Sequence, residues 1–196
     1  PIDVLSVEDY KYLPFFSYVI TSLGFGNYDW IQATSKVACT TGGLDSFCFV
    51  FSSTSLLLEK AGVTSSDSLQ EAQKKLFDYD SVAGRHWLFF KVKTLEEKLP
   101  EALELFFQCI HAPCFTDEKR IQDLFTEYKN DFMASLIPMG NFYAASRSYC
   151  KLSRIKAIDE IFNGLTQLKA IETISALSNK ELLEKLKEVF KNGYNV

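Results

Sequence analysis

The sequence contains very little imidazole: its 196 residues include two histidines, His86 and His111. No stretch has the order H-E-x-x-H, H-x-x-E-H or C-x-x-C, the usual short patterns that supply zinc ligands. G-x-S-x-G is also missing, and no cysteine lies in a recognisable nucleophile motif. These absences argue against a metal-dependent, serine or cysteine hydrolase centre built from a local motif of these residues.

Long apolar runs and runs of basic residues are missing too. No segment approaches the roughly 18 uninterrupted apolar residues of a membrane-spanning helix. Lysine and arginine are interleaved with acids and the net charge is −4, so the sequence predicts neither a nucleic-acid nor a membrane partner. The chain begins at Pro1 without a signal-peptide pattern, and because it lacks a first Met we expect processing or truncation upstream.

The five cysteines are odd in number and irregularly spaced, which predicts reduced and mostly buried thiols rather than disulfides. Cys109, His111 and Cys114 are close enough in sequence to be weighed as zinc ligands, but no fourth ligand is near. We favour a histidine near the negative end of a helix at His111, and a hydrogen-bonded strand histidine at His86. The other three cysteines are Cys39, Cys48 and Cys150.

Hydrophobic residues make up 47% of the chain, with 17 Phe and 9 Tyr, so one large domain can bury a substantial core. In the first half the pattern predicts a helix over 9–23, apolar on most faces and ended by Gly24 and Gly26. A second helix follows, capped by Asn27 or Asp29. Strands are predicted over 44–51 and 86–92, and the intervening 52–83 is expected to be a loop and a short helix.

The second half is predicted to be helical. One helix is expected over 99–110, with Leu103, Phe106, Phe107 and Ile110 as its buried stripe. Another opens at Thr116 and is lined on one face by Ile121, Leu124, Phe125, Tyr128 and Phe132. Further helices are predicted over 141–152, 155–162 and 165–176. The last predicted helix opens with a capping box at Ser178 and ends at Gly193.

The order of these elements carries a resemblance. The stretch from Leu13 to Phe47 reads LPFFSYVITSLGFGNYDWIQATSKVACTTGGLDSF, and GRHWLFFKVKTLEEKLPEALELF and TDEKRIQDLFTEYKNDF follow. This pattern resembles the pitrilysin/insulinase family of zinc peptidases, most closely its presequence-protease branch. The resemblance implies an α+β fold with helices on one face of a mainly antiparallel sheet, a metallopeptidase-repeat (LuxS/processing-peptidase-like) fold. It also implies that residues 1–196 form one non-catalytic repeat, the third, and that further strands precede Pro1.

In the family's catalytic repeat, the first helix carries H-x-x-E-H and ends at a glycine. Counting back from Gly24, the matching positions are Phe15, Tyr18 and Val19, none of which matches a ligand or the general base of the motif. The resemblance therefore implies no catalytic residue and no metal in this segment, with zinc held in the N-terminal half of a longer parent. It implies that this segment forms part of the wall of a chamber that encloses short unfolded peptides. Its partners would be the parent's other repeats and the peptide, and its location the cytoplasm or an organelle matrix.

Other interpretations stay open. The parent could be a catalytically dead scaffold or interaction homologue, or the chain could be a small-molecule-binding α+β domain unrelated to peptidases. In the family, an arginine and a tyrosine of the last repeat reach the substrate. Because this chain resembles the third repeat, we do not carry that role onto Arg147 or Tyr149, and we expect solvated or structural roles for Arg147 and Arg154.

Overall fold

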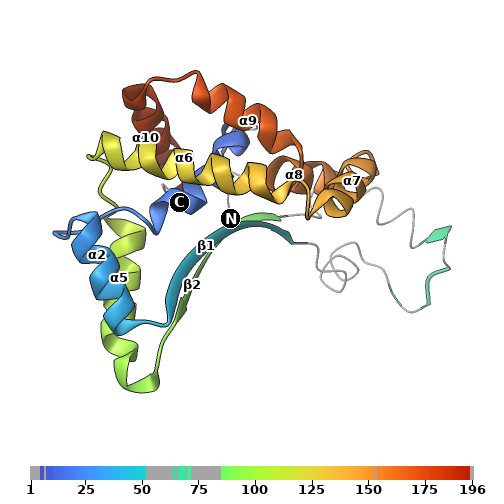
Figure 1. The fold of residues 1–196 in the computed structure, drawn as a ribbon. Helices are drawn as coiled ribbons and strands as arrows, with labels where there is room; N and C mark the ends of the chain where they lie inside the picture. The colour runs from blue at the N-terminus through green and yellow to red at the C-terminus, as the bar shows by residue number, and fades with distance from the viewer. Residues whose placement is uncertain are drawn as a thin grey trace.

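The structure is a computed structural model, and it describes residues 5–6, 8–51, 64, 66–68, 70–71, 85–152 and 154–194 (Figure 1). Over these residues the chain is mostly helical with one small antiparallel sheet, an α+β fold as predicted. Most of the predicted segment 52–83 lies outside the described residues. The helices are α1 (Leu13–Ile20), α2 (Trp30–Thr40), α5 (Leu99–His111), α6 (Glu118–Ser135), α7 (Gly140–Tyr149), α8 (Arg154–Asn163), α9 (Thr166–Ser175) and α10 (Asn179–Tyr194), with 3-10 turns at Asp9–Tyr12 and Glu96–Lys98.

The sheet consists of β1 (Gly43–Phe51) and β2 (Arg85–Lys93), which pair antiparallel from Gly43 opposite Lys93 to Phe51 opposite Arg85. Both predicted strands are confirmed, each slightly longer than expected. On the inner face the β1 side chains are buried, and α1 and α8 pack there (Figure 1). On the outer face Phe47 and Phe89 stack with ring centroids 5.6 Å apart and remain exposed.

Helix α1 lies at the centre of the larger hydrophobic core. Its apolar side chains contact β1 on one side and α6 on the other. The predicted face of α6 is confirmed, because Ile121, Leu124 and Phe125 are buried and the rest of the stripe packs against the same core. The other core contributors are Leu5, Tyr10, Tyr12, Cys48, Val50, Phe115, Ile158, Phe162, Ile171, Ile174, Leu182, Leu183, Leu186 and Val189.

Local sequence signals place most helix starts correctly. Asp29 accepts from the Gln32 amide at 2.8 Å while its own amide donates to the Gln32 side chain, which forms a capping box. Asp117 accepts from the Arg120 amide at 2.9 Å. Between the first two helices, Gly26 has φ +58°, a left-handed conformation that favours glycine, as predicted for this stop.

Three predictions are wrong. α5 fully buries Ala102, Leu105 and Cys109, and of the predicted stripe Phe106 packs against the core while Leu103 and Phe107 are exposed. α10 continues through Gly193 to Tyr194 rather than ending there, because that glycine keeps helical backbone and lies near Leu5. The thiols are unpaired, as expected, but they are not mostly buried: Cys48 and Cys109 are buried, Cys39 is exposed, and Cys114 and Cys150 are partly exposed.

Candidate functional site

The first candidate is the segment of α1 that carries Phe15, Tyr18 and Val19. Phe15 and Val19 are completely buried. The Phe15 ring lies edge-on to Phe125, with centroids 5.3 Å apart, and at 5.4 Å from Tyr128. Tyr18 is half-buried, 5.6 Å from the same tyrosine ring. This face of α1 is therefore an aromatic contact with α6.

The polar atoms around this contact are held in their neutral forms. Burial, with the nearby Glu127 carboxylate as a second cause, raises the pKa of Tyr18. Burial also raises the pKa of Tyr128, whose hydroxyl donates to Gln167 Oε1 at 3.1 Å. The pKa of the buried Cys48 thiol is raised to about 12, again mainly by burial. At neutral pH Tyr18, Tyr128 and Cys48 therefore stay protonated and offer no anionic ligand, so the Glu127 carboxylate has no imidazole or thiolate partner among them.

The β1 strand fixes α1 from the opposite side. The Ser46 hydroxyl donates a short hydrogen bond to the Ser17 carbonyl oxygen. The Cys109 thiol of α5 donates to the Ile20 carbonyl oxygen at 3.4 Å. These contacts bind a buried helix end to both neighbouring elements, and they give α1 a packing role.

The side chains of Cys109, His111 and Cys114, which were weighed as zinc ligands, do not converge on one point. Cys109 faces the core and its pKa is raised to about 12 by burial. His111 is the exposed last residue of α5 and stacks on Phe107, with ring centroids 6.1 Å apart. Cys114 lies 3.3 Å from the Thr116 hydroxyl. Within the described ranges no group of three His, Cys, Asp or Glu residues is arranged to hold a metal ion. The His86 side chain lies outside the described atoms.

Arg147 has a structural contact that sequence reasoning missed. Its Nη1 donates to the Glu160 carboxylate at 3.4 Å, and Glu160 is only 2% exposed although it is charged. Ser146 donates to the same carboxylate at 2.6 Å, and Thr166 lies 3.4 Å from it. This carboxylate ties together α7, α8 and the start of α9, and Arg147 contributes an ion pair to it from a side chain that is 57% exposed. The Arg154 side chain lies outside the described atoms.

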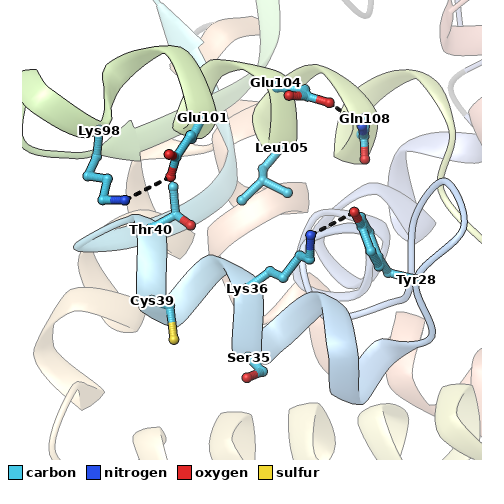
Figure 2. A pocket seen from close by; sticks show the side chains of 10 residues that line it. All are labelled: Tyr28, Ser35, Lys36, Cys39, Thr40, Lys98, Glu101, Glu104, Leu105 and Gln108. Carbon is cyan, nitrogen blue, oxygen red and sulfur yellow. Dashed lines mark hydrogen bonds and ion pairs between the residues drawn. The ribbon is translucent and has the colours of Figure 1, made fainter.

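An open groove of about 400 Å³ lies between α2 and α5 (Figure 2). Lys36 Nζ donates to the Tyr28 hydroxyl at 2.7 Å and also lies over that ring. Lys98 pairs with Glu101 at 3.0 Å, and Gln108 donates to Glu104 at 3.2 Å. The remaining lining residues are Ser35, Cys39, Thr40 and Leu105.

Figure 2 shows that these polar heads pair with one another along the walls rather than converging on one point. The groove therefore lacks a nucleophile held by a base, or a set of ligands around one centre. Sequence reasoning missed it, because its residues come from two helices about 60 positions apart and form no local motif. A second, smaller hollow of about 300 Å³ lies beside Trp30, where the Arg120 guanidinium is 4.3 Å from the ring centroid.

Helix length and hydropathy give one further negative result. In the described part of the chain, no helix combines the length and apolar character needed to cross a bilayer.

Comparison with known proteins agrees with the resemblance read from the sequence. The family model described as peptidase M-16C associated matches residues 1–79 and 78–174. Mitochondrial presequence protease of Xenopus laevis is 24% identical over 97% of this chain, and that of Danio rerio is 26% identical over 96%. An uncharacterized protein of Borreliella burgdorferi is 25% identical over 98%. The chain spans only 16–18% of the length of these relatives.

Proposed function

Because this chain belongs to the peptidase M-16C associated family and is a presequence-protease-like segment, we propose that it is a non-catalytic wall domain of a longer, zinc-dependent endopeptidase. The substrates of that enzyme are short unfolded peptides enclosed in a chamber. Zinc and the general base belong to the parent's N-terminal half, where the metal would lower the pKa of its bound water. Residues 1–196 act as a single repeat, the third, whose partners are the other repeats of the same chain.

The observation that carries this proposal is the identity of the residues at the positions of α1 that match the zinc motif. The three positions aligned with the zinc motif hold Phe15, Tyr18 and Val19, and the groups beside them are aromatic rings, the neutral Tyr128 hydroxyl and the Glu127 carboxylate. The donor set does not suit a zinc ion, so no catalytic step is assigned to this helix. The size of the relatives supports the same conclusion, since a segment that spans about a sixth of a peptidase need not contain its catalytic centre.

The finer fold is also part of the proposal. We take β1 and β2 as two strands of a larger metallopeptidase-repeat sheet, because a two-stranded ribbon is marginally stable by itself. For localisation we propose an organelle matrix or the cytoplasm, since the vertebrate relatives are named mitochondrial and the Borreliella burgdorferi relative is bacterial.

The test is metal content together with peptidase activity. Residues 1–196 purified alone should bind no stoichiometric zinc and should leave a quenched fluorescent peptide intact. The full-length protein should hold one zinc per chain and cleave that peptide until a chelator removes the metal. One tightly held zinc on residues 1–196 would refute the proposal.

The alternative is a catalytically dead scaffold, and it is favoured by the exposed apolar surface on α5 and on the outer face of the sheet. The upstream sequence distinguishes the two proposals, because H-x-x-E-H is either present there or not. A full-length protein without zinc and without activity would support the scaffold.

A further inference from the structure

The connection between α6 and α7 carries a group of exposed apolar side chains. Ile137 is 93% exposed, and Met139 and Phe142 are each 43% exposed. The three are close together in the sequence, and we call them the α7 tip. Helix α7 lies at the far end of the helix layer from α2 and α5 (Figure 1). Contiguous exposed apolar side chains mark a surface that meets a protein or a membrane.

The apolar surface continues along α7 beyond the tip. Phe142, Ala145 and Tyr149 are spaced three and four residues apart, so they share one face of the helix. Tyr149 on this face is 52% exposed. The neighbouring face is fixed to the protein, because Tyr143 is buried and its hydroxyl lies 2.7 Å from the Ser135 hydroxyl of α6. Helix α7 is therefore held against α6 through one face and exposes apolar side chains on another.

Positive charge gathers on the same segment. Residues 132–158 include no acid and four bases: Arg147, Lys151, Arg154 and Lys156. The chain as a whole has 21 bases and 25 acids. Ion pairs with Glu160 and Asp159 engage two of these bases, whose side chains are still 57% and 52% exposed. The first turn of α7 has no acid and no side-chain cap, so the positive end of the helix dipole adds to the basic character of this surface.

The exposed apolar residues of α5 have the opposite surroundings. Leu99 and Leu103 are 43% and 37% exposed, and residues 96–104 hold four acids and one base. An anionic partner would therefore be attracted to α7 and repelled by α5. A lipid surface fits α7 better than an acidic protein does, because an exposed side chain on a turn can enter a fluid apolar layer without a pocket shaped for it.

We propose that the α7 tip and the exposed face of α7 form a docking surface for a membrane that contains anionic lipids. The apolar side chains of the tip enter the boundary between headgroups and acyl chains, while the bases of 147–156 lie near the lipid phosphates. Apolar insertion and electrostatic attraction act together, as they do in other proteins that bind a membrane surface. The overall charge of −4 predicts no such partner, because an average over the whole chain hides one basic and apolar segment.

Co-sedimentation of the full-length protein with lipid vesicles tests this. We expect binding to vesicles of phosphatidylcholine and phosphatidylglycerol, and much weaker binding to vesicles of phosphatidylcholine alone. Ile137→Glu should weaken binding at least about tenfold, because it places an acid where an apolar side chain enters the bilayer. The matched control is Ile31→Glu on α2, since that side chain is 60% exposed and lies outside the proposed surface. Equal losses in the two variants, equal binding to the two vesicles, or no binding at all would overturn the proposal.

Two further variants test the charge and the direction of the effect. Lys151→Glu reverses an exposed charge just after α7 and should weaken binding to the anionic vesicles about tenfold, whereas Lys119→Glu at the start of α6 should have little effect. Ile137→Trp should strengthen binding, because tryptophan favours the membrane interface. Equal effects of the two lysine variants, or weaker binding of Ile137→Trp, would overturn the proposal. The outcome is separable from the peptidase test: an active zinc enzyme that does not bind vesicles loses only this docking surface, and a vesicle-binding protein without zinc loses only the peptidase function.

Discussion

Phe15 of α1 and Phe125 of α6 meet edge to face, with ring centroids 5.3 Å apart and an interplanar angle of 81°. This geometry is the favourable arrangement of two aromatic quadrupoles, and both rings are buried. The contact joins the first helix to the longest one, and it occupies the position at which the resemblance predicts a metal-bearing helix in the catalytic repeat. α1 therefore contributes stability through packing.

Replacing Phe15 by Ala should destabilise the fold by about 3–5 kcal/mol, because it removes a completely buried ring and leaves a cavity next to Phe125 and Tyr128. Urea denaturation followed by circular dichroism measures the change. The matched control is Ile137→Ala, since that side chain is 93% exposed and its loss should change stability by less than about 0.5 kcal/mol. Equal effects of the two substitutions would contradict the assignment of Phe15 to the core.

Tyr128→Phe should cost about 1–3 kcal/mol, since it leaves the Gln167 side-chain oxygen without its donor in a site that is 2% exposed. The Gln167 amide nitrogen already donates a short hydrogen bond to the Ile161 carbonyl oxygen, so the side chain cannot simply turn away. Thermal unfolding of the variant measures the loss. Tyr149→Phe is the control, because that tyrosine is half exposed and should tolerate the change. An unchanged melting temperature for Tyr128→Phe would refute the role of the hydrogen bond.

Helix-capping residues and apolar periodicity differ in how far they determine this fold. Helix starts depend on a side chain and an amide three residues apart, so Ser178 could be read directly and Asp29 as one of two candidates, while the cap at Asp117 lies one residue after the expected start at Thr116. The apolar face of α6 could also be predicted, because the apolar residues of this helix form one stripe. α5 has apolar residues on more than one side, and the periodicity could not tell which side meets α2 and which remains exposed.

The candidate site was less predictable. The burial of α1 follows from its apolar composition, but Glu160 lies among Ile158 and Phe162 in the sequence with no local mark of its partners. Its hydrogen bonds come from Ser146 and Thr166 on other helices. Contacts between helices depend on how the helices cross, which a local pattern does not encode.

Gly164→Ala should destabilise the protein by about 1–3 kcal/mol, because a Cβ at this position would clash with Glu160 Oε2 and lie 2.7 Å from the Glu160 carbonyl oxygen. The buried carboxylate would have to move away from Ser146. Gly140→Ala is the control: no heavy atom lies within 4 Å of its added Cβ, so it should be neutral or stabilising by up to about 1 kcal/mol. Equal effects in chemical denaturation would contradict the packing at Gly164.

The buried thiols should make stability fall at high pH. The pKa of both Cys48 and Cys109 is raised from 9.0 to about 12, mainly by burial, so the unfolded chain loses these protons first. Below pH 9 both thiols stay protonated in either state and contribute no slope. Between pH 9 and 12 each should lower the free energy of unfolding by roughly 1 kcal/mol per pH unit. The double variant Cys48→Ala/Cys109→Ala should show a shallower decline over that range, and an identical slope would refute the assignment.

Alkylation at pH 8 provides the companion measurement for the same thiols. Iodoacetamide should modify the exposed Cys39 in the native protein while Cys48 and Cys109 react only after unfolding in urea, because the reagent needs both access and the thiolate. Mass spectrometry of tryptic peptides identifies each site. Modification of Cys48 at the rate of Cys39 would mean that β1 does not bury its inner face against α1, and the assignment of α1 to the centre of the core would fail with it.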